Sequence, residues 1–481
     1  MCRKCLALAL TLFLVLLTTT TFAYGQDHTE TALKSIDEQA DHYSDIAHKI
    51  WDLAEVGYQE VRSCELLQEP LKAAGFSIEV GIADLPTAFV ATYGNGEPVI
   101  ALLAEYDALP GITQAAVPER KPLPEKKAGH ACGHNLFGTG STAAAIAIKE
   151  WLVRTKSSGT VRLYGTPAEE GGAGKVYMVR AGLFSDVDAV LHWHAGDQND
   201  ASPASSLAYI SARFQFRGVS AHAAVSPERG RSALDGVEAM NFMQNMLREH
   251  VPEDSRMHYV ITNGGSAPNV VPDLAEVWHR VRHPDVRRVT DIFGRLLDAA
   301  EGAALGTGTT VQHEIIAAVY PLLPNEVLAR VMDRSLRRVG GVHYSAAEKA
   351  FAENLQMSLP NDVPSLSTVS EIQPFAIKEP SGSTDVADVS WVVPTTGLRV
   401  ATWVPGTAPH SWQAIAAGGM SIGTKGMLVA AKTLTLTVIN LFSEPKILIE
   451  ANTEYRRRIG PNFIYKPLLG DRQPPFDYRQ D

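Results

Sequence analysis

The sequence predicts an α/β fold, in which a mostly parallel sheet with helices on both faces is interrupted by an inserted ferredoxin-like α+β domain. Strands and helices alternate in the first part of the chain, as they do in a parallel sheet. Over about 110 residues in the middle, the order changes to β-α-β-β-α-β, which is the split ferredoxin-like motif. The length of 481 residues also exceeds what one compact core usually holds, so two domains are expected.

The first part of the α/β domain is predicted from the spacing of its apolar residues. An unbroken apolar run over residues 99–104 is typical of a buried parallel strand. A first helix, which Gly57 ends, is predicted by apolar residues at helical spacing: Ile36, Ala40, Tyr43, Ala47, Ile50 and Ala54. The other elements expected here are a helix over 63–74 with Pro70 badly placed inside it, a helix over 139–152, a strand over 160–164, a helix over 175–181 and a strand over 189–191.

The inserted domain is predicted over residues 207–320, between the two parts of the α/β domain at 26–206 and 321–481. Its expected elements are strands over 209–216, 257–261, 276–281 and 310–315, and helices over 231–247 and 289–304. Helices resume after Pro324, and residues 428–441 form the clearest of them. From Gly460 onward, prolines and polar residues indicate an irregular tail.

Residues 1–25 are predicted to be a secretory signal and not part of the fold. Arg3 and Lys4 precede an apolar run over 6–17, and the small residues Ala23 and Gly25 follow it. A retained membrane anchor is the alternative, but it needs about 20 apolar residues, and the threonines at 18–21 end this run. Cleavage after Gly25 would make the protein secreted or periplasmic.

Cysteine usage agrees with an exported protein that has no disulfide framework. Cys2 and Cys5 would leave with the signal, so the mature chain keeps Cys64 and Cys132. If Cys132 is a metal ligand, Cys64 is expected to be a small core residue.

The charge balance excludes two classes of partner. The full chain has a net charge of −10, and removing Arg3 and Lys4 leaves 41 basic against 53 acidic residues, a net charge of −12. An acidic protein is not expected to bind nucleic acid or an anionic membrane surface, so a soluble protein with a small-molecule partner is favoured.

The most informative motif is Gly-His-Ala-Cys-Gly-His-Asn at residues 129–135. His130, Cys132 and His134 offer a thiol and two imidazoles, which suit zinc, manganese or cobalt better than calcium or magnesium. Gly129 and Gly133 favour a kinked loop that could bring such ligands together. By itself the motif is either a ligand set or a coincidence.

Other polar residues follow the predicted strands, at the edge where ligands bind in parallel sheets. Asp107 follows the strand over 99–104, and Glu169 and Glu170 follow the next strand and precede a glycine-rich run. Metal-dependent hydrolysis needs one carboxylate on the metal and one that takes a proton from water, and two adjacent glutamates can divide these roles. The alternative is that the pair lies on a solvated loop.

Three histidines are further candidates. His192 and His194 share one side of a strand end, and His194 lies nearer the following loop, so it is preferred as a ligand, although either could be a satisfied core histidine. Whether His192 assists His194 stays open. His410, in a loop bounded by proline and glycine, could be a ligand or a surface residue.

Several motifs in the same order along the chain resemble those of the metal-dependent amidohydrolases and exopeptidases. This family includes aminoacylases, carboxypeptidase-G-type enzymes and auxin-conjugate hydrolases, and the chain is most similar to its branch of p-aminobenzoyl-glutamate hydrolases, in the form of their B-type subunit. The resemblance covers roughly residues 35–445. The motifs that carry it are residues 104–110, 129–135, 168–172, 193–194, 221–224, 230–235, 268–272, 383–386 and 409–412.

The resemblance implies a site with two divalent metal ions, which would be zinc, manganese or cobalt. It implies that Glu169 is the general base and that Asp107 supports the site. Other branches have a metal-binding histidine at the position of Glu105, and this glutamate is not counted as a ligand. The implied ligands are Cys132, His134, Glu170, His194 and His410.

The inserted domain corresponds to the family's lid and dimerisation domain. His222 would be remote from the metals of its own chain, and the resemblance implies that it reaches the partner subunit's site and polarises the scissile carbonyl. Asn269 and Arg282 would hold the substrate, with Arg282 on its carboxylate. Arg282 could instead be an ordinary exposed strand residue. A homodimer through this domain is expected, or a heterodimer with a related subunit.

The function implied is hydrolysis of the amide bond of N-acyl or N-aroyl amino acids, similar to p-aminobenzoyl-glutamate, or of dipeptides. Two alternatives remain at this point. Cys132 could be the nucleophile of a thiol hydrolase. The chain could also be a non-catalytic binding or regulatory subunit of a paired amidohydrolase.

Overall fold

Aliphatic strands build a six-stranded sheet at the centre of the larger domain in the computed structural model, which describes residues 28–478. The strand order is β1-β2-β6-β3-β7-β12, and the pairings show that β2 runs against the other five strands. The strands are β1 (Ser77–Val80), β2 (Phe89–Asn95), β3 (Val99–Ala104), β6 (Gly159–Gly165), β7 (Ala189–Gly196) and β12 (Thr395–Ala401). The predicted signal at residues 1–25 lies outside the described residues.

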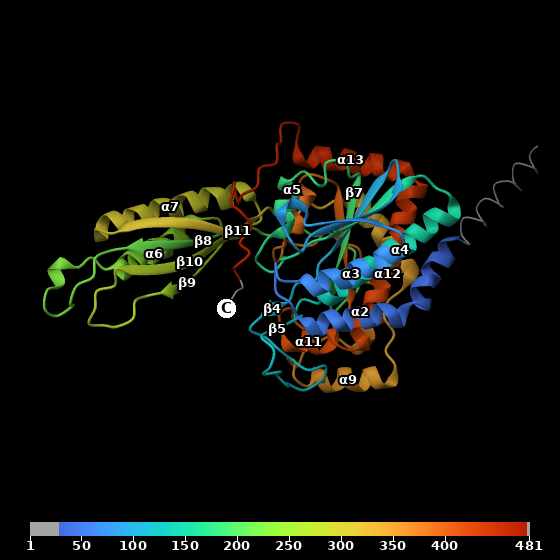
Figure 1. Ribbon diagram of the computed structural model, residues 1–481, viewed down its shortest axis with the longest axis horizontal. Coiled ribbons are helices and arrows are strands. Elements are labelled where there is room, and N and C mark those ends of the chain that lie inside the picture. Colours follow the sequence, from blue (N-terminus) through green and yellow to red (C-terminus); the bar gives the residue numbers. More distant parts are fainter. Residues whose placement is uncertain (1–27, 479–481) are drawn as a thin grey trace, which may run out of the picture.

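Helices cover both faces of this sheet (Figure 1). The helices of this domain are α2 (Ala40–Leu53), α3 (Val61–Ala73), α4 (His134–Thr155), α5 (Gly174–Arg180), α8 (Glu326–Val339), α9 (Ala346–Gln356), α10 (Val386–Ser390), α11 (Trp412–Gly418), α12 (Ser421–Ser443) and α13 (Pro445–Ile459). In the part of the chain that the structure describes, α12 is the one helix long and apolar enough to cross a membrane. It is mostly buried against α4, α8 and the sheet, as a core helix is.

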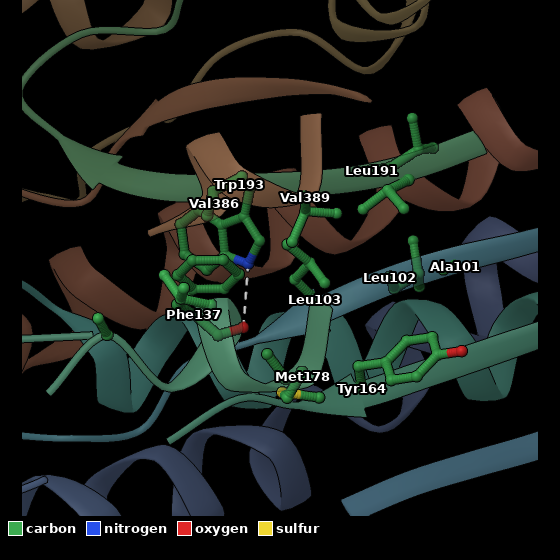
Figure 2. Close-up of a cluster of buried hydrophobic side chains, with 14 of the residues drawn as sticks. Ala101, Leu102, Leu103, Phe137, Tyr164, Met178, Leu191, Trp193, Val386 and Val389 are labelled. Carbon is green, nitrogen blue, oxygen red and sulfur yellow. Dashed lines mark hydrogen bonds between the residues drawn. The ribbon is translucent and has the colours of Figure 1, made fainter. Parts of the chain in front are cut away.

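The core of this domain lies between the sheet and its helices. Figure 2 shows Trp193 of β7 next to Phe137 of α4, and the Trp193 indole Nε1 donates to the Phe137 carbonyl at 3.1 Å. Leu102 and Leu103 of β3 are fully buried in the same cluster. This packing fixes the start of α4 relative to β3 and β7, whose ends carry the candidate site.

Residues 208–319 form the inserted domain, which projects from one side of the larger domain (Figure 1). Its antiparallel sheet has the order β11-β8-β10-β9, and α6 and α7 pack on one face of it. The elements are β8 (Ala208–Arg217), α6 (Ala233–Leu247), β9 (Arg256–Asn263), β10 (Leu274–His283), α7 (Val286–Thr307) and β11 (Thr310–Val319). The predicted fold class is therefore confirmed, whereas the domain boundaries at residues 206/207 and 320/321 stay predictions.

Some predicted elements differ from those observed. Helix α4 begins at His134, five residues before the predicted start, because Gly133 adopts a left-handed φ of 76° and turns the chain directly into the helix. Strand β7 continues to Gly196, so His192 and His194 lie within the strand. Helix α3 accommodates Pro70 near its end.

Candidate metal centre

The site forms where β3, β6 and β7 end and α4 begins. Cys132 lies in the turn before α4, and His134 is the first residue of that helix. A Cβ on Gly133 would lie 2.6 Å from the Cβ of Ala195, so the turn needs glycine for space as well as for its φ angle. The close approach places Cys132 next to β7, where its Sγ lies 3.3 Å from the Nε2 of His194.

Six predicted site residues come together there in three overlapping groups. Within each group, the atoms that could bind a metal lie within 4.8 Å of one another. The groups are Cys132, His134 and His194; Cys132, Glu170 and His410; and His134, Glu169 and Glu170. The structure thus brings all five predicted ligands and the predicted base into one cluster, while their individual roles stay predictions.

Two of the histidines are oriented by contacts on the nitrogen that faces away from the cluster. The Nδ1 of His134 lies 2.9 Å from Oδ1 of Asp107, and the Nδ1 of His194 lies 2.7 Å from the carbonyl oxygen of Ala195. Metal-binding histidines typically donate their second N–H to a carboxylate or a backbone carbonyl in this way. Together with the thiol and the carboxylates, this arrangement fits divalent metal ions.

Asp107 links the start of α4 to the loop that carries the two glutamates. Its Oδ2 accepts a hydrogen bond from the backbone N–H of Glu170 at 2.8 Å, while its Oδ1 contacts His134. This agrees with the supporting role predicted for Asp107.

His410 comes from a loop far along the chain. Its backbone has a left-handed φ of 61°, and its N–H donates to the carbonyl of Ala131 at 3.0 Å. That bond holds the loop beside the turn before α4, and the His410 Nε2 lies 3.3 Å from the Oε1 of Glu170. The His410 side chain is about half exposed, so it lies at the open side of the cluster.

Burial and crowding of carboxylates dominate the electrostatics of the site. Burial raises the pKa of Glu169 well above its usual range, and the nearby carboxylates of Glu105 and Glu170 add to this effect. Burial also raises the pKa of Cys132, and it lowers the pKa of His194 to about 4. A site that concentrates acidic groups in this way favours bound cations.

A buried ion-pair network lies beside the cluster and was not predicted from the sequence. The Lys175 Nζ lies 2.7 Å from Oε1 of Glu105 and 2.7 Å from Oδ1 of Asp385, and all three side chains are almost fully buried. The other Glu105 oxygen lies 3.1 Å from the Nε2 of His134. Asp385 lies in the motif over residues 383–386, but Lys175 carried no signal beyond its place after the glycine-rich run.

Three predicted residues lie on the inserted domain, outside the cluster. His222 and Asn269 are exposed at the outer end of this domain, where residues 222 and 270 form a β-bridge. Arg282 instead lies near the junction of the domains, with its guanidinium 5.6 Å from the ring centre of Tyr209. Burial raises the pKa of Tyr209 to about 12, and the charges of Glu169 and Asp385 contribute, which places this ring within electrostatic reach of the site.

Of the remaining candidates, His130 and His192 are explained without a metal. The His130 Nε2 lies 3.1 Å from the carbonyl of Ile50, and burial lowers the pKa of His130 to about 3, as expected of a neutral core histidine. His192 is packed against Gly397, and burial lowers its pKa to about 4.

Comparisons with known proteins agree with this geometry. A family model described as peptidase family M20/M25/M40 matches residues 101–374. The chain is 41% identical over 450 residues to the B subunit of the p-aminobenzoyl-glutamate hydrolase of Escherichia coli, covering 88% of this chain and 94% of that protein. It is 29% identical to the Xaa-Arg dipeptidase of Mus musculus, covering 89% and 92% of the two chains.

A solved structure shares the fold. The crystal structure of a dinuclear metal binding peptidase of the M20 family from Bacillus subtilis aligns with a TM-score of 0.56 at 17% identity, covering 85% of this chain and 99% of that one.

Proposed function

The chain belongs to peptidase family M20/M25/M40 and is a metal-dependent amidohydrolase, and from this premise we propose that it hydrolyses N-acyl or N-aroyl amino acids or dipeptides at a site with two divalent metal ions. The observation that carries the proposal is the single cluster of Cys132, His134, Glu169, Glu170, His194 and His410. The metals proposed are zinc, manganese or cobalt, because the donors mix thiol, imidazole and carboxylate.

In the proposed mechanism, Glu169 moves the proton. Bound divalent ions would polarise the scissile carbonyl and make water more acidic. Glu169 accepts the proton of the attacking water and later donates it to the leaving amine, and its raised pKa suits a group that must both accept and release a proton. Asp107 keeps His134 and the backbone of Glu170 in place during both steps.

The proposed substrate class is supported by a cleft of ≈ 820 Å³ between the two domains. Residues 53–56 and Gly171 line it on one side, and Arg213, Trp278 and Arg280 of the inserted domain line it on the other. Guanidinium groups match a free carboxylate, and the indole offers an apolar surface to an acyl or aroyl group. The names of the Escherichia coli and mouse relatives indicate the two substrates to test first, p-aminobenzoyl-glutamate and Xaa-Arg dipeptides.

We further propose that the inserted domain forms a dimer with a second copy or a related subunit. Strand β9 is an edge strand with Tyr259, Val260 and Ile261 exposed, and α6 exposes Phe242 and Met246. An open strand edge beside apolar side chains is suited to pairing with another chain. Such a dimer would give His222 and Asn269, at the outer end of the domain, a route to the partner's site.

The two other candidate functions are not favoured. A non-catalytic subunit would not need the complete donor set together with Glu169. In a thiol hydrolase Cys132 would act as a thiolate, but burial raises the pKa of this thiol and lowers the pKa of the neighbouring His194.

Export through the signal at residues 1–25 is also proposed, on the sequence pattern alone. Mass analysis of the mature protein from an exporting host is expected to show an N-terminus at Gln26. An intact N-terminus on exported protein would contradict it.

The test of the mechanism is the Glu169→Ala variant. We expect it to keep about two equivalents of metal while kcat on the panel of N-acyl amino acids and dipeptides falls at least ~10²-fold, because the general base is lost. The matched Glu170→Ala variant is expected to lose metal as well as activity. Near-normal turnover by Glu169→Ala would overturn the assigned role, and metal analysis of the wild-type protein identifies the ions.

A further inference from the structure

The C-terminal tail, residues 460–478, takes an ordered course from α13 to the junction of the two domains (Figure 1). The Phe463 ring packs on Trp391 at 4.8 Å between ring centres, and the Tyr465 ring lies 5.3 Å from that of Tyr320, the residue that follows β11. Leu469 is buried in the main core. The first part of the tail is therefore anchored where the chain returns from the inserted domain.

The tail then contacts the inserted domain through a charged pair. Arg472 donates from Nε and Nη2 to Oε1 of Glu314 in β11, at 3.1 and 2.7 Å. The Arg472 side chain is mostly buried, which reduces screening by solvent. On the other side, the Arg180 guanidinium of α5 donates to the backbone carbonyls of Gly470 and Arg472 at 3.1 and 2.8 Å. The tail thus joins β11 of the inserted domain to α5 of the larger domain.

The last described residues of the tail reach the loop of the two glutamates. The Tyr478 hydroxyl donates to the backbone carbonyl of Glu170 at 3.3 Å. Phe476 and Tyr478 both pack edge-on against Tyr58, with ring centres 5.4 and 5.8 Å away. The Tyr58 hydroxyl in turn donates to the carbonyl of Gly172 at 2.7 Å in the same loop.

This approach is built into the sequence of the larger domain. A Cβ on Gly57 would lie 2.3 Å from the Tyr478 oxygen, so the residue at position 57 must be small for the tail to dock. Tyr58 itself has a left-handed φ of 64°, which a bulky residue adopts at a cost unless its contacts hold it there. Tyr478 also lines the cleft between the domains.

We propose that the C-terminal tail is a strap that positions the Glu169–Glu170 loop through Tyr478 and Tyr58 and holds the inserted domain against the larger domain through Arg472. Its catalytic effect rests on the proposed function, because the loop carries the proposed base and one metal ligand. Tyr478, Phe476 and Arg472 are positioning residues, since they act through backbone, ring and charge contacts with other residues.

The loop contact is tested with Tyr478→Ala and Phe476→Ala in the full-length protein. We expect backbone amides of residues 168–174 to exchange with solvent at least about tenfold faster than in the wild type. We also expect kcat to fall about 10- to 100-fold at unchanged metal content, because small displacements of reacting groups are costly. Tyr478→Phe keeps the ring and should restore most of both properties, and Ile464→Ala, at an exposed tail position, serves as the control.

Exchange is measured without substrate, so it separates this proposal from the proposed function. Faster exchange in a protein that hydrolyses none of the panel would support the strap and contradict the function. Wild-type exchange and wild-type kcat in both Ala variants would overturn the strap. A chain that ends at Gly470 is expected to combine both defects, and if it does not fold, the point variants decide.

The contact with the inserted domain is tested by exchanging the charges of Arg472 and Glu314. The single variants Arg472→Glu and Glu314→Arg are expected to increase the radius of gyration in X-ray scattering and to raise KM, and the double variant should reverse both changes. Arg458→Glu is the control, because its partner Glu454 lies in the same helix. Single variants with wild-type scattering and KM would show that Arg472 does not hold the domain.

Discussion

A single lysine compensates two buried carboxylates beside the metal centre. Burial would favour the neutral form of Glu105, but the Lys175 ammonium and His134 outweigh that effect and lower the pKa of this carboxyl. Asp385 holds the lysine from the other side. The network therefore connects α5, α10 and the end of β3 to the first residue of α4.

Replacing Lys175 with Met is expected to reduce the free energy of unfolding by about 3–5 kcal/mol, because it leaves two carboxylates buried without a counter-charge. Urea unfolding measures the change. Lys446→Met is the control, since Lys446 forms an exposed pair with Glu450, and we expect it to cost at most about 0.5 kcal/mol. Equal effects of the two variants would show that the buried network contributes little.

Asp388 gives a prediction on pH. Burial raises its pKa to about 7, although the Tyr465 hydroxyl and the Tyr320 N–H donate hydrogen bonds to it. In the unfolded chain an aspartate titrates near pH 4, so between about pH 4 and pH 7 the folded state binds one proton more than the unfolded state. This carboxyl therefore lowers the free energy of unfolding as the pH rises, by up to about 1.4 kcal/mol per pH unit.

The Asp388→Asn variant stays neutral at all these pH values. Its free energy of unfolding, minus that of the wild type, is expected to increase from pH 5 to pH 7 and to level off above. Denaturant unfolding of both proteins at each pH gives the difference. A difference that does not change with pH would contradict the shifted pKa.

At the scale of elements, the start of α4 is the part that the site depends on most. Gly133 has to turn the chain with a positive φ in a space that Ala195 fills. Cys132 and His134 flank it directly, so a disturbance at this turn moves two proposed ligands.

Gly133→Ala is expected to destabilise the protein by more than Gly182→Ala and to weaken metal binding. Both glycines have a φ near 77°, so both variants should lose the ~1–2 kcal/mol that a left-handed residue with a Cβ costs. The new Cβ at 182 meets nothing within 4 Å, whereas the one at 133 overlaps Ala195. Urea unfolding and metal titration compare them, and equal metal affinity in the two variants would contradict the role of this turn.

Sequence periodicity predicted many elements but missed others. The apolar run of β3 and the helices α2, α6 and α7 have strong local patterns, and they were predicted close to their observed positions. Strands β1, β2 and β12 were not predicted. β12 is parallel to β7, with Thr395 opposite Val190, and a pairing across that many residues leaves no local pattern to read.

At the scale of the whole molecule, the inserted domain carries predicted residues in two places. Arg282 lies near the junction of the domains, while His222 and Asn269 lie at the outer end. If the outer end acts at all in catalysis, a second subunit has to bring it to a metal centre.

Mixing two inactive variants tests this arrangement. We expect Glu169→Ala and His222→Ala homodimers both to be impaired. Heterodimers formed after unfolding and refolding together should contain one intact site, which restores about one quarter of wild-type activity in a statistical mixture. Mixed protein with no more activity than the two separate variants would contradict the contribution of His222 across subunits, as would full activity of His222→Ala.

The sequence by itself determined the fold class, the chemistry of the donors and the turn at Gly133, because these follow from local periodicity, residue type and backbone freedom. The tertiary structure decided the rest. It placed His410 beside Ala131, joined Asp107 to Glu170, buried Lys175 between Glu105 and Asp385, and brought Tyr478 to the glutamate loop. These contacts join residues far apart in the chain, and their energies depend on burial, which exists only once the sheet and helices have packed.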